Sequence, residues 1–306
     1  MLDPAGDPGE VPGQARRAEQ LGFDAVAAGE HVFFHGPVSN AFVTLASAAA
    51  VTDRVRLLTA LTVLPLYPAA LATKMAATLD RLSHGRLNLG IGVGGEHPPE
   101  FAACHVPVGH RGAKTDESLD IMLRLLRGEH VTADGEFAHL DGMSLEPLPV
   151  QRPNPPIWVG GRSPAAARRA GRFGDVWMPY FVTPQRLSAS LSQARDAASR
   201  AGRSAESVEG AVFLWGAVAR DAARARTQAV QAVSATYNQD FEPLADRYLL
   251  TGRPADLVHR LGEYRDAGAS SVIFSPACAP EHRTAMIELF AQEVLPATVD
   301  STTTGR

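Results

Sequence analysis

Residues Ala69–Gly92 read AALATKMAATLDRLSHGRLNLGIG and contain a helix, a turn and a strand in succession. Apolar residues recur with helical spacing over Ala69–Leu82, and Ser83-His84-Gly85 stops that helix. Arg86–Gly92 is then a short apolar run with the length of a buried strand, and it leads into a cluster of glycines. A strand that follows a helix in this way is typical of the repeating unit of a parallel sheet.

The same alternation runs along the whole chain. Seven short apolar runs are predicted as strands, and the helices between them imply parallel pairing through right-handed crossovers. Seven such units exceed what a small doubly wound sheet usually holds, so the predicted fold is α/β, a (β/α)8 (TIM) barrel. The predicted strands are 23–28, 55–63, 86–92, 157–159, 175–179, 208–219 and 271–275, and the predicted helices are 9–21, 42–51, 69–82, 113–126, 163–173, 184–201, 222–237, 254–267 and 281–293.

One strand of the eight is missing from this count. A barrel of this kind begins with a strand before the helix at 9–21, where the sequence offers only Met1–Pro8. Three explanations are open: the first strand lies in residues absent from this sequence, another segment fills the gap, or the barrel is open.

The remaining organisation is that of one domain over residues 1–299 with a polar tail at 300–306, which we expect to be mobile. Residues 96–150 form an insertion after the fourth barrel strand. Asp134-Gly135 and Asp141-Gly142 are hairpin-turn signals, so we expect short β-strands in that insertion.

Composition excludes several classes of function. The 306 residues are 45% hydrophobic and 20% charged, and the formal net charge of −4 gives no electrostatic reason to expect nucleic acid or an anionic membrane as a partner. No apolar run approaches the roughly 20 residues that a membrane helix needs. Cys104 and Cys278 lack metal-ligand spacing, so we expect a cytoplasmic protein without a metal site.

Glu30 and His31 directly follow the predicted strand 23–28. In a barrel, side chains at the carboxyl ends of the strands project into the catalytic mouth. A carboxylate beside an imidazole holds it in one tautomer and lets it exchange protons near neutral pH. We therefore interpret His31 as catalytic and oriented by Glu30; the alternative is an ordinary pair at a strand end that caps the following loop.

Gly160-Gly161-Arg162-Ser163-Pro164 joins a predicted strand to a helix. The two glycines allow close approach of the backbone, Ser163 has the capping position and Pro164 the first helical position. Free amides and the helix dipole form an anion site there, to which Arg162 adds a charge-assisted bond. We predict that Gly160, Gly161, Arg162 and Ser163 bind a phosphate; a βα turn without a ligand is the alternative.

Gly90, Gly92 and Gly94 alternate, so they share one face of their strand. The absent side chains leave a floor on which a planar ring can lie, whereas tight packing inside the barrel is the alternative explanation. Gly94 and Gly95 at the strand end are the better candidates for contact with a cofactor, and we include Gly92 with them.

Several short motifs, in the right order from about Pro8 to Ser275, resemble the bacterial luciferase-like oxidoreductases, within them the branch that uses the deazaflavin coenzyme F420. The resemblance implies a barrel with an insertion after its fourth strand, usually dimeric, that binds a flavin or deazaflavin at the carboxyl ends of the strands. The motifs that carry it are 18–24, 29–31, 76–86, 90–95, 151–163 and 170–175.

The resemblance also assigns residues. It implies a cis peptide bond without proline at Ala60–Leu61, within Thr59-Ala60-Leu61, which forms a bulge behind the cofactor ring; these three residues are candidate cofactor-binding residues. A carboxylate–histidine pair at the place of Glu30 and His31 lies over the cofactor in similar enzymes. We expect a homodimer formed by the early helices, 42–51 and 69–82.

The function implied is hydride transfer between coenzyme F420 and a small organic substrate, with His31 exchanging the balancing proton. The first alternative is an FMN-dependent monooxygenase that uses reduced flavin and oxygen behind a lid formed by the insertion. A non-catalytic binding or subunit protein is a further alternative, motivated by the absent first strand. A hydrolase would need convergent carboxylates or a metal set, and Glu30 has no obvious second carboxylate partner in the sequence.

Overall fold

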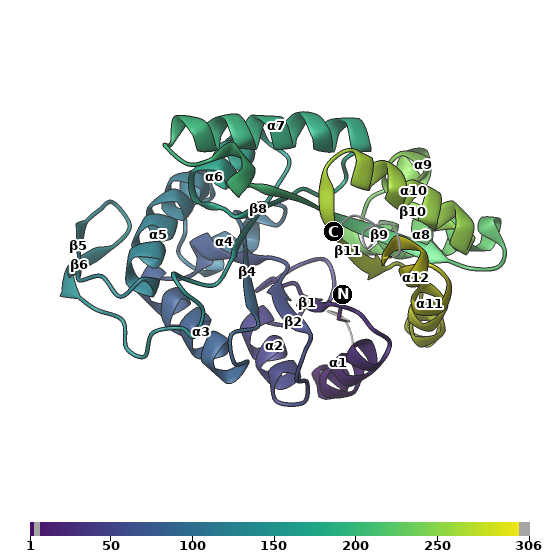
Figure 1. Cartoon of the computed structure of the whole chain (residues 1–306), viewed down its shortest axis with the longest axis horizontal. Helices are drawn as coiled ribbons and strands as arrows, with labels where there is room; N and C mark the ends of the chain where they lie inside the picture. Colours follow the sequence, from purple (N-terminus) through teal and green to yellow (C-terminus); the bar gives the residue numbers. More distant parts are fainter. Residues whose placement is uncertain (3–6, 300–306) are drawn as a thin grey trace, which may run out of the picture.

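The computed structural model describes residues 1–2 and 7–299, and its centre is a curved parallel sheet surrounded by helices (Figure 1). The strands of this sheet are β1 (Ala25–Ala28), β2 (Arg56–Thr59), β3 (Thr62–Val63), β4 (Leu87–Gly92), β7 (Ile157–Gly160), β8 (Val176–Met178), β9 (Glu209–Val218), β10 (Leu250–Gly252) and β11 (Ala269–Pro276). They pair in the order β1-β2-β4-β7-β8-β9, β3 pairs with β4, and both β10 and β11 pair with β9. The predicted barrel is therefore confirmed as a nearly closed parallel sheet.

All nine predicted helices are present with ends shifted by a few residues, whereas α4, α9 and α12 were not predicted. Each of these three is shorter than the two turns over which a helical period can be recognised. The α-helices are α1 (Val11–Gln20), α2 (Ala41–Ala49), α3 (Ala69–Leu82), α4 (Pro98–Ala103), α5 (Arg111–Leu126), α6 (Pro164–Phe173), α7 (Pro184–Arg200), α8 (Ala222–Tyr237), α9 (Ala245–Tyr248), α10 (Pro254–Asp266), α11 (Pro280–Glu293) and α12 (Leu295–Val299), and the 3₁₀ turns are η1 (Pro8–Glu10), η2 (Leu64–Leu66), η3 (Val108–His110), η4 (Ala205–Ser207) and η5 (Glu242–Leu244).

The insertion contains the expected hairpin, formed by β5 (Val131–Asp134) and β6 (His139–Met143), which extends away from the barrel (Figure 1). Its turn follows Asp134, where the Gly135 N–H donates to the Ala138 carbonyl at 3.0 Å. The second turn signal was wrong, because Asp141-Gly142 lies inside β6. A dipeptide signal alone does not tell a turn from a glycine that a strand accommodates.

Met1 and Leu2 lie in the gap between β1 and β11. The Leu2 N–H donates to the Ala27 carbonyl of β1 at 2.8 Å, and the Met1 amino group donates to the Phe274 carbonyl of β11 at 2.9 Å. Of the three explanations for the missing strand, the described residues therefore show a short segment that fills part of the gap. Residues 300–306, for which we expected mobility, lie outside the described residues.

The motif at 76–86 stabilises the amino ends of the strands. Asp80 is fully buried and accepts hydrogen bonds from the Val150 N–H at 2.7 Å and the Gln151 N–H at 3.0 Å. Arg86 is also buried, and its guanidinium donates to the carbonyls of Val55 and Thr52, both at 2.8 Å. This motif therefore stabilises the barrel at the end opposite to the predicted site.

None of the helices within residues 1–2 and 7–299 combines the length and the apolar composition that crossing a membrane requires.

Candidate active site

His31 pairs with a carboxylate that the sequence analysis did not identify. Its Nδ1 lies 3.1 Å from both carboxylate oxygens of Glu100, a fully buried residue of α4 in the insertion. Glu100 also accepts the Val32 N–H at 3.2 Å. Because an ionised carboxylate only accepts hydrogen bonds, it places the proton on Nδ1 and leaves Nε2 to exchange a proton with a ligand.

Glu30 does not orient His31, so that prediction was wrong. One Glu30 oxygen accepts the Val63 N–H at 2.9 Å. The other accepts the Ala41 N–H at 3.2 Å, the Asn40 amide at 3.2 Å and the Tyr67 hydroxyl at 3.0 Å. These four hydrogen bonds occupy both carboxylate oxygens, and they connect the end of β1 to β3 and to the first turn of α2.

Burial raises the pKa of Glu30, while the hydrogen bonds from Val63, Ala41 and Tyr67 oppose this rise. The burial of Tyr67, together with the charge of Glu30, raises the pKa of Tyr67, so the phenol stays protonated and donates to Glu30. We call Glu30 and its four donors the Glu30 cluster. Its hydrogen bonds stabilise the site rather than leave a group free for chemistry.

The peptide bond Ala60–Leu61 is cis, as predicted. It lies between β2 and β3. Thr59 is fully buried there, and its hydroxyl donates to the Gly90 carbonyl and accepts the Gly90 N–H, both at 2.8 Å. Thr59 therefore supports the bulge from inside the barrel, whereas Ala60 and Leu61 are partly exposed.

The glycines of β4 and β7 make room for this bulge. A Cβ atom on Gly90 would overlap the Thr59 carbonyl oxygen, and one on Gly160 would overlap the Leu61 side chain. A Cβ on Gly92 would lie 3.2 Å from Leu61 Cδ1. The prediction of an open floor was wrong for Gly90, because the Thr59 carbonyl fills that space, and the packing alternative holds there.

Gly94 and Gly95 connect β4 to the insertion. A Cβ on Gly94 would lie 2.7 Å from Val63 Cγ1. Gly95 has a φ of +110°, and a Cβ there would lie 2.7 Å from Arg111 Nε. Arg111 in turn donates to the Val108 carbonyl at 2.7 Å. The two glycines therefore let the insertion pack closely on the mouth, and both are partly exposed there.

The loop at 160–163 has the features of an anion site. The Ser163 hydroxyl caps α6 by accepting the Ala166 N–H at 3.2 Å. The N–H groups of Ser163, at the N-cap, and of Ala165, in the first turn, have no acceptor within the helix. Pro164, between them, has no N–H. Gly161 has a φ of +123°, and a Cβ there would lie 2.8 Å from Ala166 Cβ. These donors and this close approach fit a phosphate.

Aromatic rings line the mouth beside His31. Phe34 stacks on the imidazole at 4.2 Å between ring centroids, and it also contacts Tyr237 edge-on at 6.0 Å. Tyr237 accepts the Trp215 indole N–H at 3.2 Å. These rings could not be identified from the sequence, because they come from a loop, a strand and the end of a helix that lie far apart in the chain.

Two cavities lie at opposite ends of the barrel. A small one of about 140 Å³ is lined by His31 and by members of the Glu30 cluster. The other, about 1570 Å³, lies at the amino ends of the strands, where Ala25, Arg56 and Glu209 line it together with Met1. Barrel enzymes carry their chemistry at the carboxyl ends, so we assign the site to the smaller hollow despite its size.

A model of the luciferase-like monooxygenase family matches residues 1–271 of the chain. Uncharacterised proteins of Mycobacterium bovis and Mycobacterium tuberculosis are 34% identical to it over 176 residues, which make up 57% of this chain and 60% of the relatives. The chain therefore spans about 60% of the length of the curated relatives that it matches.

Solved structures give the same fold. The monooxygenase RslO1 from Streptomyces bottropensis is 29% identical, with a TM-score of 0.84 and 96% of both chains covered. An F420-dependent secondary alcohol dehydrogenase, solved with an F420–acetone adduct, is 22% identical with a TM-score of 0.84, again over 96% of both chains. The second likeness shows the fold alone.

Proposed function

The chain belongs to the luciferase-like monooxygenase family, and on this premise we propose that it transfers a hydride between coenzyme F420 and a small organic substrate. The observation that carries the proposal is the pair of His31 and buried Glu100 at the carboxyl ends of the strands. Transfer of a hydride to a carbonyl, or from an alcohol, needs a group that exchanges a proton with the substrate oxygen. We assign this proton exchange to His31 Nε2.

The residues present fit the cofactor class. Coenzyme F420 and FMN both carry a phosphate, and the Ser163 and Ala165 N–H groups with the Arg162 guanidinium would hold it. Leu61 lies over Gly92 and presents an apolar surface on which a planar ring can pack. Bound there, the cofactor supplies the hydride chemistry, while the protein orients it and excludes water.

Glu100 gives His31 its chemical role. A buried carboxylate at 3.1 Å from Nδ1 accepts the proton of that atom and keeps the Nε2 lone pair free for a proton from substrate. Phe34, stacked on the same ring at 4.2 Å, restricts its rotation. Together they hold Nε2 in one orientation, which is what proton exchange with a bound substrate needs.

An FMN-dependent monooxygenase is the second candidate, and the 29% identity to the monooxygenase RslO1 favours it. The insertion contacts the mouth through α4, whose Glu100 faces His31 and accepts the Val32 N–H. This candidate needs the same phosphate site and the same histidine, so the fold does not separate the two.

The cofactor separates them. Mass spectrometry and visible absorbance of the protein as isolated identify a retained cofactor, and titration with F420 and with FMN compares their affinities. We expect F420 to bind more tightly and its reduced form to be oxidised by a panel of ketones and aldehydes. Tighter FMN binding with oxygen-dependent turnover would favour the monooxygenase, and binding of neither would favour a non-catalytic protein.

We also propose that the protein is a homodimer through α2 and α3. The outer faces of these helices expose Val43 at 70% and Leu71 at 50%, which is apolar surface that a second copy of the chain would bury. Sedimentation velocity tests the proposal, and a monomer at micromolar concentration would reject it.

A further inference from the structure

Arg162 lies between the glycines and the cap of the phosphate-binding loop, and its side chain has a defined position. The guanidinium carbon is 4.7 Å from the centroid of the Tyr180 ring and 5.9 Å from that of Phe181. Cations are attracted to the faces of aromatic rings at these distances. A long, exposed side chain that would otherwise sample many rotamers is therefore restricted at the mouth.

Tyr180 is itself fixed at both ends. Its hydroxyl donates to the carboxylate of Glu96, in the loop that follows β4. Its backbone forms a bridge with Phe213 of β9. Burial and the charge of Glu96 raise the pKa of Tyr180, so the phenol stays protonated and continues to donate. The loops after β4, β7 and β8 thus meet at one polar and aromatic contact.

We call the Tyr180 and Phe181 rings under Arg162 the platform, and Phe181 extends it toward α8. It has a φ of +48°, which a residue with a bulky side chain adopts only when its surroundings hold it there. Its ring is buried and lies 5.3 Å from Tyr237 and 5.1 Å from Phe241. The rings under Arg162 are therefore packed against other rings.

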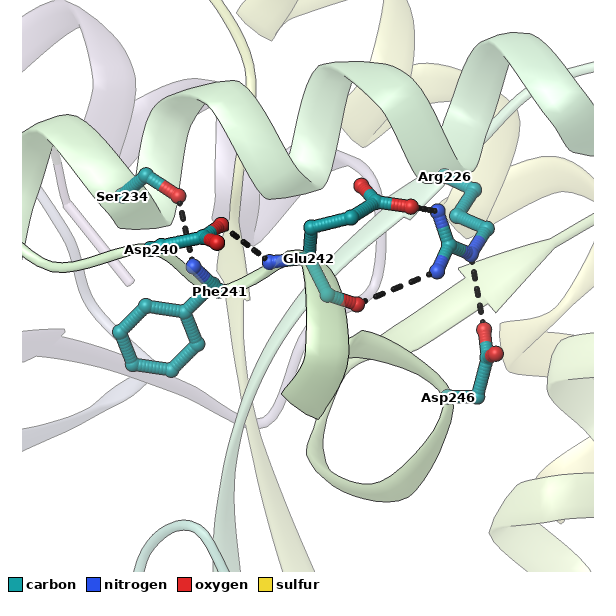
Figure 2. A network of polar contacts seen from close by, with 6 residues as sticks. All are labelled: Arg226, Ser234, Asp240, Phe241, Glu242 and Asp246. Atoms are coloured by element: carbon teal, nitrogen blue, oxygen red, sulfur yellow. Dashed lines mark hydrogen bonds and ion pairs between the residues drawn. The ribbon is translucent and has the colours of Figure 1, made fainter.

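Figure 2 shows how the far side of the platform is attached. Arg226 of α8 forms ion pairs with Glu242 and, at 2.8 Å, with Asp246, while the Phe241 N–H donates to the Ser234 hydroxyl at 3.0 Å. These contacts hold the segment that carries Phe241 against α8. Exposed ion pairs contribute little stability singly, but several on one short segment restrict its position.

From this arrangement we infer that Tyr180 and Glu96 are positioning residues for Arg162, which contacts the phosphate of the bound cofactor and makes the site selective for phosphorylated flavins and deazaflavins. The inference rests on the proposed function. Glu96, bonded to the Tyr180 hydroxyl, repels an anion, and the guanidinium over the same ring offsets this repulsion at the loop. A prearranged guanidinium also loses less conformational entropy when the anion binds.

The test compares ligands that share a ring system and differ in their anionic groups: riboflavin lacks only the phosphate of FMN, whereas 8-hydroxy-5-deazariboflavin lacks the phosphate and the carboxylate-bearing tail of F420, so the FMN pair decides the role of the phosphate. FMN is paired with riboflavin, and F420 with 8-hydroxy-5-deazariboflavin, and each affinity is measured by fluorescence titration of the full chain. For Arg162→Gln we expect the affinity for FMN and F420 to fall about tenfold or more, while that of the phosphate-free compounds changes by less than about twofold.

Substitutions of Tyr180 test the positioning role. Tyr180→Leu removes the ring, and we expect a loss of about threefold to tenfold for the phosphorylated ligands only. Tyr180→Phe keeps the ring and loses the bond to Glu96, so a smaller loss is expected. Combining Tyr180→Leu with Arg162→Gln should cost no more than Arg162→Gln alone, because both remove the same contact.

Arg172→Gln is the matched control. Its guanidinium lies 4.5 Å from the Phe173 ring at the opposite end of α6, so the same kind of contact is removed away from the loop. Equal losses for FMN and riboflavin in the Arg162 or Tyr180 variants, or no loss, would overturn this inference alone. If the unaltered protein binds none of the four compounds, the proposed function fails and the inference fails with it.

Discussion

Two buried carboxylates flank His31, and their surroundings differ in kind. Glu30 is the sequence neighbour of His31, but it accepts hydrogen bonds from the Val63 and Ala41 main chain. Glu100 is 69 positions away in the sequence, and it faces the imidazole. Consecutive residues after a strand project in different directions, so adjacency in sequence separates side chains as readily as it joins them. One carboxylate is therefore bonded to the main chain of the site, and the other contacts the histidine that we propose as catalytic.

The largest effect that this comparison predicts is on rate. In Glu100→Gln the amide keeps an acceptor for the Val32 N–H but offers a donor to His31 Nδ1, which moves the ring proton to Nε2 and removes the base. We expect turnover of F420 with a ketone or alcohol to fall by about 10²- to 10⁴-fold, with the fold intact by circular dichroism.

Glu136→Gln is the control for that substitution. Glu136 pairs with His110 at 3.2 Å on the surface, with side chains 63% and 54% exposed, so it reproduces the carboxylate–histidine contact outside the site. The activity of this variant should match the unaltered protein. If Glu30→Gln lowers turnover as strongly as Glu100→Gln at equal stability, the division of roles between the two carboxylates is wrong.

The second prediction concerns stability. Glu30→Ala leaves the buried N–H of Val63 and the buried N–H of Ala41 without their acceptor, and each such loss costs about 1–3 kcal/mol. We expect the free energy of unfolding in urea to fall by about 2–4 kcal/mol, more than it does for Glu100→Gln. A larger loss for Glu100→Gln would place the structural role on α4 instead.

Sequence analysis predicted the barrel because period and strand length are local properties, and 69–92 shows both in one stretch. It also located the cap at Ser163 and the cis bond at Ala60–Leu61, the first from residue type and the second from resemblance. It missed Glu100 because α4 has only six residues and no helical period, and because the contact with His31 depends on how the insertion folds back. The aromatic rings at the mouth depend on tertiary packing in the same way.

The Glu30 cluster can be examined one donor at a time. Tyr67→Phe removes the hydroxyl that donates to Glu30 at 3.0 Å and that accepts the Asn40 amide at 2.7 Å. We expect a loss of about 1 kcal/mol in the free energy of unfolding. The loss should disappear in a Glu30→Ala background, since the two groups interact directly. Additive losses would show that Tyr67 stabilises the protein through other contacts.

The smallest effect is a pH dependence that belongs to Glu30. Burial raises the pKa of Glu30 above its ordinary value of 4.5, so the native state binds its proton more tightly than the unfolded chain does. The stability contributed by the protonated carboxyl is complete below pH 4.5 and is lost as pH rises through the raised pKa. The free energy of unfolding of the unaltered protein should therefore fall, relative to Glu30→Gln, as pH rises above this value.

One proton limits the slope of this fall to about 1.4 kcal/mol per pH unit. Urea titrations of both proteins from pH 4 upward measure the difference in the free energy of unfolding. If the unaltered protein instead gains stability relative to Glu30→Gln as pH rises, the hydrogen bonds from Val63, Ala41 and Tyr67 outweigh burial, and the cluster stabilises a charged carboxylate.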